Sequence, residues 1–208
     1  MTLKIHHLNN SRSQRILWLL EELAVPYELV QHQRDAVTSL APASLQAIHP
    51  LGKSPMIEDD GYIIYESGAI VEYLCERHGG SHFIPARGTA DHVRYMEWMH
   101  FAEGSAMTPI LLNLYVGRLG EAGAPLHPRI HEQLESHYHY MESQLRPSGW
   151  FVGDSLTGAD FMLSFPAEAA VISGRAADKP KLTAFVKAIH ARPQWQTALA
   201  KGGTYAFA

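Results

Sequence analysis

The sequence has little cysteine, no excess of basic residues and no long apolar run. Its 208 residues include one cysteine, Cys75, so the chain has neither an internal disulfide nor a CxxC redox centre. The formal net charge is −4 at pH 7, which argues against a nucleic-acid binder, because such proteins carry a basic patch. The longest apolar runs are far shorter than the roughly eighteen residues of a transmembrane helix, so we expect no membrane span.

The first residues also lack the apolar stretch of a secretory signal peptide. Together with the scarcity of cysteine, this favours a reducing cytoplasm. The 46% hydrophobic and 18% charged content is typical of a globular chain, and 208 residues are enough for two domains. We therefore expect a cytoplasmic, globular protein that binds neither nucleic acid nor membrane.

The first part of the chain alternates between strand and helix patterns. Apolar residues at helical spacing follow a short strand, and Asp60-Gly61 joins two β-favouring runs in a predicted hairpin. The expected strands are 3–8, 27–31, 56–59 and 62–65, and the expected helices are 14–23, 44–48 and 67–78. This β-α-β-α-β-β-α order predicts a small α/β domain.

The remainder of the chain has helical patterns only. Residues 79–88 are rich in glycine and read as a linker. Apolar residues in 130–145 and 182–189 then recur every three or four positions, and Thr157 with Asp160 has the spacing of a capping box. The predicted organisation is an α/β domain over 1–79, a linker over 80–88 and an all-helical domain over 89–208.

Three short segments of the α/β domain combine polar side chains with a strand end or a helix start. The first, 10–13, lies before a helix, where free N–H groups and the helix dipole favour an anion. A hydroxyl there can stabilise a thiolate and lower a thiol pKa from its usual ~8.5. The alternative is that Ser11 or Ser13 only caps the helix.

The second and third segments suit a peptide and its charged ends. If Pro55 is cis, the backbone of Ser54 can pair with an extended ligand; otherwise the segment is a turn that enters a strand. Ser67 at a helix start suits a carboxylate, and Glu66 beside it suits an ammonium group. The alternative for this pair is an ordinary N-cap serine beside an acid.

Four stretches, in the order of a known family, resemble glutathione transferases. They are Ser11-Arg12-Ser13 with 19–23, the loop 49–55, Glu66-Ser67-Gly68-Ala69-Ile70, and the capping segment 153–160. The resemblance covers nearly the whole chain and implies a thioredoxin-like N-terminal domain followed by an all-helical C-terminal domain. It also implies glutathione as co-substrate, no metal, and a homodimer.

The resemblance implies a role for each matching residue. Glu66 and Ser67 would bind the γ-glutamyl head of glutathione. Ser54, before a cis Pro55, would pair with the cysteinyl backbone, and Lys53 would approach the glycyl carboxylate. Because no Tyr or Cys lies near the first turn, the group that activates the sulfur is expected to be Ser11, with Asn10 or a backbone N–H as the alternative.

A second-substrate pocket is expected between the two domains, with Phe101 and Met107 as candidate wall residues, because aromatic and Met side chains suit an adaptable apolar pocket. The other candidate groups receive a structural interpretation. The thirteen histidines lack a metal-ligand pattern such as HExxH, so we expect solvated side chains. Cys75 has apolar neighbours and is expected to pack within a helix.

The predicted function is transfer of the glutathione thiolate to a small hydrophobic electrophile. Two alternatives remain open at this point. One is a glutathione-dependent disulfide reductase or peroxidase on the same fold, which would use the sulfur of glutathione itself. The other is a non-catalytic scaffold that binds glutathione, because a fold does not fix a function.

Overall fold

The computed structural model describes residues 2–208, and the chain divides into two compact units. The first unit extends to Ile84 and also contains His190–Ala208, whereas the second is Pro85–Ile189. The first boundary falls inside the expected linker. The last nineteen residues differ from the expectation, because 190–208 pack with the first unit and not with the helical one.

The first unit is built on a four-stranded sheet in the order β2-β1-β3-β4. Strands β1 and β2 are parallel, and the other two pairings are antiparallel. Ile5 pairs with Leu29 on one side and with Ile57 on the other, and both isoleucines are fully buried. The strands are β1 (Lys4–Leu8), β2 (Glu28–His32), β3 (Met56–Asp59) and β4 (Tyr62–Tyr65).

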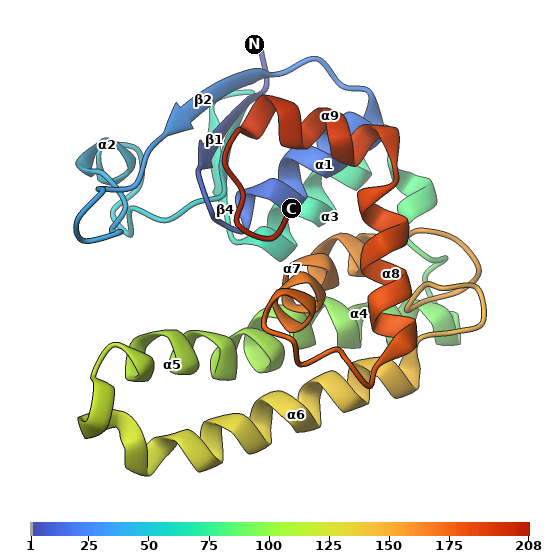
Figure 1. Ribbon diagram of the computed structural model, residues 1–208. Coiled ribbons are helices and arrows are strands. Elements are labelled where there is room, and N and C mark those ends of the chain that lie inside the picture. Colours follow the sequence, from blue (N-terminus) through green and yellow to red (C-terminus); the bar gives the residue numbers. More distant parts are fainter. Residues whose placement is uncertain (1) are drawn as a thin grey trace. The chain divides into compact units, whose positions relative to one another are not determined.

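The hairpin of β3 and β4 forms as the sequence predicts. Asp60 and Gly61 both have positive φ, of 47° and 85°, the conformation that a tight two-residue hairpin requires. Helices surround the sheet of this unit (Figure 1). They are α1 (Ser13–Leu23), α2 (Ala43–Gln46), α3 (Ser67–Arg77), α9 (Pro193–Gly202) and the short 3-10 helix η1 (Ser81–Phe83).

Helix α1 is the centre of the first unit. It contacts β1, α3 and α9, and its residues from Ser13 to Leu20 are all buried. A helix that is covered on several sides must bury polar residues as well as its apolar stripe. The buried surface of α1 therefore extends beyond its apolar stripe, and Ser13 and Gln14 are as inaccessible as the leucines.

The C-terminal segment is fastened to α1 by charge pairs and by a close helix crossing. The Arg192 guanidinium donates two hydrogen bonds to the Glu22 carboxylate, of 2.5 and 2.8 Å. At the other end of α9, Gly202 is buried so tightly that a Cβ atom would lie 2.9 Å from both Gln14 Oε1 and Leu17 Cδ1. The two helices can approach this closely only because residue 202 has no side chain.

The second unit is entirely helical among its described residues. Its core includes Trp98, Phe151 and Phe185, with ring centroids 5.0 and 5.1 Å apart along that series. The predicted capping box is present: the Asp160 carboxylate accepts from the Thr157 N–H at 2.7 Å. The helices are α4 (Ala90–Phe101), α5 (Met107–Gly117), α6 (His127–Gln144), α7 (Gly158–Ile172), α8 (Pro180–His190, of which His190 belongs to the first unit) and the 3-10 segment η3 (Gly120–Leu126).

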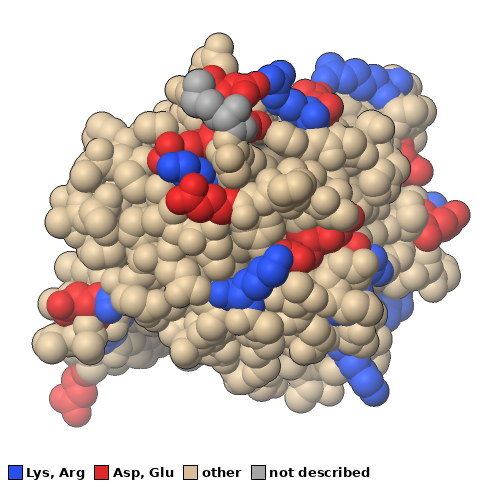
Figure 2. All heavy atoms as spheres, turned by 90° about the horizontal axis from the view of Figure 1, so that it is seen from above, with Lys and Arg blue, Asp and Glu red and all other residues tan. Residues whose placement is uncertain are grey.

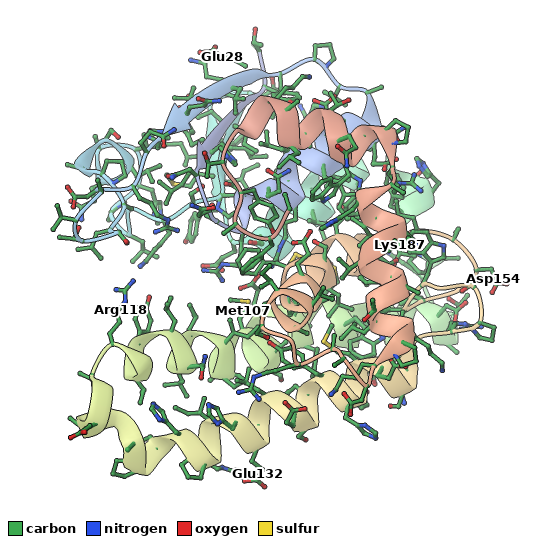
Figure 3. All side chains as sticks on the ribbon, in the orientation of Figure 1. Glu28, Met107, Arg118, Glu132, Asp154 and Lys187 are labelled. Atoms are coloured by element: carbon green, nitrogen blue, oxygen red, sulfur yellow. The ribbon has the colours of Figure 1, made fainter. Side chains whose placement is uncertain are left out.

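A π-helical turn, η2 (Ala102–Ala106), joins α4 to α5. Phe101 and Met107, the two residues expected to line a second-substrate pocket, lie at its two ends. Phe101 is half-buried and contacts Trp98 and Tyr140, whereas Met107, labelled in Figure 3, is 2% exposed. Single-turn π segments are rare in helices and frequently occur at functional sites.

None of the described helices is long and apolar enough to cross a membrane. On the face shown in Figure 2, acidic and basic side chains lie among each other, and large areas carry neither. This face therefore has no continuous basic patch.

The close crossing of α9 and α1 gives a direct prediction for stability. We expect Gly202→Ala to lower the free energy of unfolding by about 1–3 kcal/mol, because the added methyl group has no space in the interface. Gly117→Ala is the matched control, since no atom lies within 4 Å of its Cβ position. Urea unfolding monitored by circular dichroism measures both; equal stability of the two variants would contradict the prediction.

Candidate active site

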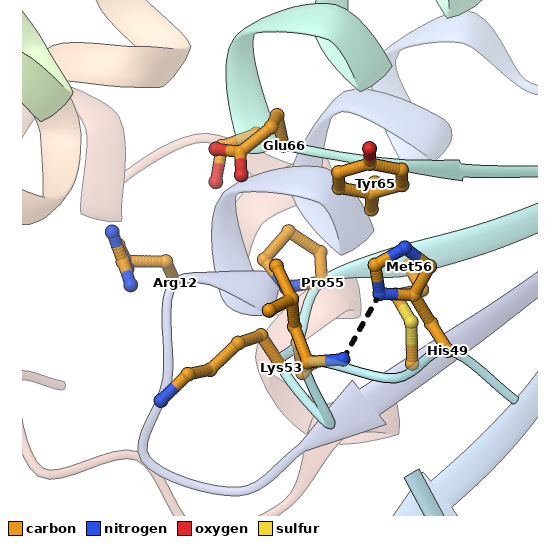
Figure 4. A pocket seen from close by; sticks show the side chains of 10 residues that line it. Arg12, His49, Lys53, Pro55, Met56, Tyr65 and Glu66 are labelled. Carbon is orange, nitrogen blue, oxygen red and sulfur yellow. Dashed lines mark hydrogen bonds between the residues drawn. The ribbon is translucent and has the colours of Figure 1, made fainter. Parts of the chain in front are cut away.

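A pocket of about 240 Å³ opens in the first unit, at the place where three of its chain segments meet. The segments are the turn before α1, the loop that leads into β3, and the junction of β4 with α3. In Figure 4 the charged ends of Arg12, Lys53 and Glu66 lie on one side of the pocket, and the rings of His49 and Tyr65 on the other. The lining residues are Arg12, His49, Leu51, Lys53, Ser54, Pro55, Met56, Tyr65, Glu66 and Ser67.

Glu66 turns the chain from β4 into α3 in a single residue. Its φ of 68° and ψ of 121° lie outside the regions that a residue with a side chain prefers. Such a conformation costs on the order of 1–3 kcal/mol and is found mainly where a site requires it. The turn brings the Glu66 carboxyl group and Ser67, the first residue of α3, into the same pocket.

The start of α3 gives this part of the pocket its preference for anions. Ser67 is 4% exposed and lies among the first N–H groups of the helix, which have no acceptor within the helix itself. A carboxylate can accept hydrogen bonds from these groups and is favoured by the helix dipole. Glu66 beside it offers the opposite preference, for a cation.

The loop before β3 contains the predicted cis peptide bond between Ser54 and Pro55. The Ser54 hydroxyl donates to the His6 carbonyl at 2.8 Å, which fastens the loop to β1. Lys53, one residue earlier, extends along the rim of the pocket (Figure 4). The expectation of a cis bond is therefore confirmed.

The turn before α1 is held by polar contacts on several sides. Asn10 has a φ of 50°, and its carbonyl accepts from Arg34 at 3.3 Å. Ser11 is 6% exposed, and its Oγ lies 2.7 Å from Ser13 Oγ and accepts from the Ser13 N–H at 3.2 Å. Arg12 is the N-cap residue, so Ser11 lies one position before the N-cap and contacts the helix through the Ser13 N–H.

His7 lies beneath this turn and links it to the end of α9. Its Nδ1 is 2.8 Å from Ser13 Oγ, and its Nε2 is 3.1 Å from the Gly202 carbonyl oxygen. Burial, opposed by the hydrogen bond to Gly202 and assisted by the nearby His32, lowers the pKa of His7 to about 4, so the ring is neutral at neutral pH. A neutral ring can donate from one nitrogen and accept at the other.

The structure brings together the five residues that were expected to bind glutathione, namely Lys53, Ser54, Pro55, Glu66 and Ser67. Ser11 and Asn10 lie in the same turn as Arg12 but do not themselves line the pocket. Sequence reasoning missed five lining residues: Arg12, His49, Leu51, Met56 and Tyr65. Each is adjacent in sequence to a predicted residue or lies within a motif, so proximity to the motifs was the available signal.

Cys75 lies apart from the pocket lining. Cys75 is fully buried in α3, and burial raises its pKa to about 12, which is the behaviour of a packing residue and not of a nucleophile. Among residues 2–208, no group of three or more His, Cys, Asp or Glu side chains is arranged to hold a metal ion.

Two family models match the chain on either side of its middle. The "Glutathione S-transferase, N-terminal domain" matches residues 5–82, and the "Glutathione S-transferase, C-terminal domain" matches residues 121–202.

Relatives and solved structures agree with this assignment. Glutathione S-transferase 3 of Schizosaccharomyces pombe is 36% identical over 80% of this chain and 73% of its own length. Glutathione S-transferase 1 of Saccharomyces cerevisiae is 31% identical over 90% and 89% of the two chains. The crystal structure of a glutathione S-transferase from Actinobacillus pleuropneumoniae has a TM-score of 0.90 at 32% identity, covering 99% of this chain and 95% of its own.

With this fold and these relatives, the chain belongs to the glutathione S-transferase family and is a transferase. The four-stranded sheet with its helices is the thioredoxin-like domain of that family, and the second unit corresponds to its helical domain.

The buried His7 predicts a loss of stability in mild acid. The unfolded chain takes up a proton on His7 near pH 6.5, whereas the folded chain takes it up near pH 4. Between these values protonation favours the unfolded chain, so stability falls by about 3 kcal/mol as the pH drops through this interval, and His7 contributes no such loss above it.

Urea unfolding of the wild type and of His7→Gln at pH 7 and pH 4.5 measures this effect. Glutamine can still donate to Gly202 but does not titrate, so the acid-induced loss should be smaller in the variant. An equal loss in both proteins would show that His7 is not the group responsible.

Proposed function

We propose that this transferase binds glutathione in the pocket of its first unit and transfers the thiolate to a small hydrophobic electrophile. The observation that carries the proposal is the charge pattern of the pocket: Glu66 and the start of α3 on one segment, with Lys53 and Arg12 on two others. Glutathione has two carboxylates and one ammonium group: the ammonium matches Glu66 in sign, and the carboxylates match the start of α3 and Lys53, with Arg12 as a further cation of the lining.

The binding mode follows from the chemistry of each segment. The γ-glutamyl carboxylate would accept from Ser67 and the first N–H groups of α3, and the ammonium would pair with Glu66. The cysteinyl backbone would run along Ser54, whose position before the cis Pro55 is fixed by its bond to the His6 carbonyl. Lys53 would meet the glycyl carboxylate. This extended pose would direct the sulfur toward the turn that contains Asn10 and Ser11.

The reaction needs a thiolate and a fixed position for it. The thiol of glutathione releases its proton to solvent, and a hydrogen-bond donor in the turn, Ser11 or Asn10, stabilises the sulfur anion. The sulfur then attacks the electrophilic carbon: the new C–S bond forms, and the leaving group departs with the electron pair of the bond that breaks. The protein contributes a lowered thiol pKa and proximity.

An apolar second substrate requires an apolar wall, and we propose Phe101 and Met107 for this role. Both flank the π-helical turn of the second unit, and a methionine adapts to differently shaped ligands. A disulfide reductase or peroxidase reaction would use the sulfur of glutathione in the same position, since Cys75 is buried and cannot supply a reactive thiol.

We further propose that the transferase is a cytoplasmic homodimer. Both units carry neighbouring large apolar side chains that are exposed, as at surfaces that contact a partner. In the first unit Tyr62 and Ile63 of β4 are 69% and 44% exposed, and in the second Leu114 and Tyr115 of α5 are 49% and 55% exposed. The cytoplasm is favoured by the single buried cysteine, which needs no oxidising compartment.

The binding mode predicts that Glu66 and Ser67 are needed for affinity. We expect Glu66→Gln and Ser67→Ala each to weaken glutathione binding by about 1–3 kcal/mol, because each removes one partner of a charged group on the ligand. Isothermal titration calorimetry measures the change. Glu72→Gln is the control, since Glu72 is an exposed acid of α3 outside the pocket. Unchanged affinity in both pocket variants would refute the proposed binding mode.

Turnover distinguishes the proposed reaction from its alternatives. We expect glutathione-dependent release of chloride from a chlorinated nitroaromatic, with slower reduction of a mixed disulfide or a hydroperoxide. Faster reduction than conjugation would assign the chain to the reductase or peroxidase alternative. Retention on immobilised glutathione without turnover of any of these substrates would favour a scaffold.

A further inference from the structure

The C-terminal segment reaches the turn before α1 through two backbone groups. The Gly202 carbonyl oxygen lies 3.1 Å from His7 Nε2, and the Ala206 N–H donates to Asn10 Oδ1 at 2.7 Å. The segment that makes both contacts is part of the first unit, and the C-terminus of the chain lies there as well (Figure 1). Because backbone groups are either donors or acceptors and never both, these contacts fix where the hydrogen atoms of the turn must lie.

The Gly202 contact determines the hydrogen position on His7. A carbonyl oxygen can only accept, so Nε2 carries the hydrogen, and the lowered pKa of His7 leaves Nδ1 without one. The Ser13 hydroxyl, 2.8 Å from Nδ1, therefore donates to the ring. The Leu8 carbonyl, at 3.2 Å, is a more distant acceptor for the Ser13 hydroxyl.

This arrangement places the hydroxyl hydrogen of Ser11 in a hydrogen bond within the turn. With its own hydrogen directed to His7, Ser13 Oγ acts as an acceptor toward Ser11 Oγ, 2.7 Å away. The Ser11 hydroxyl then donates to Ser13 and accepts from the Ser13 N–H at 3.2 Å. A hydroxyl has one hydrogen, so Ser11 has none left for a sulfur atom outside the turn.

Asn10 is in the opposite situation. The Ala206 N–H can only donate, so the atom that it meets is the amide oxygen, and the Asn10 amino group points away from the C-terminal segment. Among residues 2–208, no acceptor lies within hydrogen-bond distance of that amino group, and the side chain is exposed. Arg34 holds the other side of the turn through the carbonyls of Asn9 and Asn10, at 3.1 and 3.3 Å.

We propose that residues 202–206 shape the site of the glutathione thiol. They orient Asn10 so that its amino group donates a hydrogen bond to the glutathione sulfur. Through His7 and Ser13 they also keep the Ser11 hydroxyl hydrogen in a bond within the turn. This inference rests on the proposed function. Asn10 would be the catalytic residue, and His7 and the Ala206 backbone would be positioning groups.

The test compares the ultraviolet thiolate titration of bound glutathione in the wild type and in variants. Asn10→Gly removes the amide, and glycine tolerates the φ of 50°. Ala206→Pro removes the donor N–H; Ala206 is the second residue of the turn closed by the 3.2 Å bond from Ala208 N to the Tyr205 carbonyl, a position that proline favours. Ala206→Ser retains the N–H and is the matched conservative variant.

We expect Asn10→Gly to raise the thiol pKa by about one to two units, the range for losing a hydrogen bond to a charged group. Ala206→Pro should raise it in the same direction by less, and Ala206→Ser should restore the wild-type titration. Because the contacts to the head of glutathione remain, kcat should fall while KM for glutathione changes little. Ser11→Ala should shift the titration less than Asn10→Gly. Thermal unfolding verifies that each variant is folded.

The outcomes separate this inference from the proposed function. A wild type that leaves the glutathione thiol unshifted would overturn both. A wild type that lowers the thiol pKa, with Asn10→Gly and Ala206→Pro indistinguishable from it, would overturn the inference alone. A larger shift in Ser11→Ala than in Asn10→Gly would also overturn it, and would return the role of donor to Ser11.

Discussion

The hydrogen bond between His7 and the Gly202 carbonyl is the contact on which the arrangement of the first unit depends. It joins β1 to the end of α9, and through Ser13 it also reaches the start of α1. It exists because a glycine lets α9 approach α1 so closely that any side chain at 202 would collide with Gln14 and Leu17. Packing at this crossing therefore determines the hydrogen-bond pattern of the turn that adjoins the pocket.

Two segments of the pocket lining have unusual backbone geometry. Glu66 has a positive φ without being glycine, and the Ser54–Pro55 bond is cis. The start of α3 and the loop before β3 both line the pocket, and the charged ends of Lys53, Arg12 and Glu66 lie on one side of it. The proposed binding of glutathione rests on these charges.

Much of the fold could be predicted from the sequence because it depends on local chemistry. The Asp60-Gly61 hairpin, the Thr157–Asp160 capping box and the helical spacing in α1 each involve residues within a few positions of one another. The expected binding residues also lie together, because each belongs to a short motif at the end of a strand or the start of a helix. The same local reasoning placed Cys75 in a helix core, where the structure has it.

The rest depends on residues that are distant in sequence. The place of 190–208 in the first unit rests on pairs such as Arg192 with Glu22, 170 positions apart, and no periodicity reveals such a pair. His7 belongs to none of the motifs in the sequence, and its contact with Gly202 joins residues 195 positions apart. The choice between Ser11 and Asn10 stayed open in the sequence because it depends on where hydrogen atoms lie, and the proposal in favour of Asn10 rests on these distant contacts.

A crystal structure of the glutathione complex would show where the sulfur of glutathione lies. The proposed binding mode has the γ-glutamyl carboxylate at Ser67 and the start of α3, the cysteinyl backbone alongside Ser54, and the sulfur within hydrogen-bond distance of the Asn10 amino group. A tripeptide bound elsewhere, or one whose sulfur meets the Ser11 hydroxyl while the Asn10 amino group faces solvent, would contradict it.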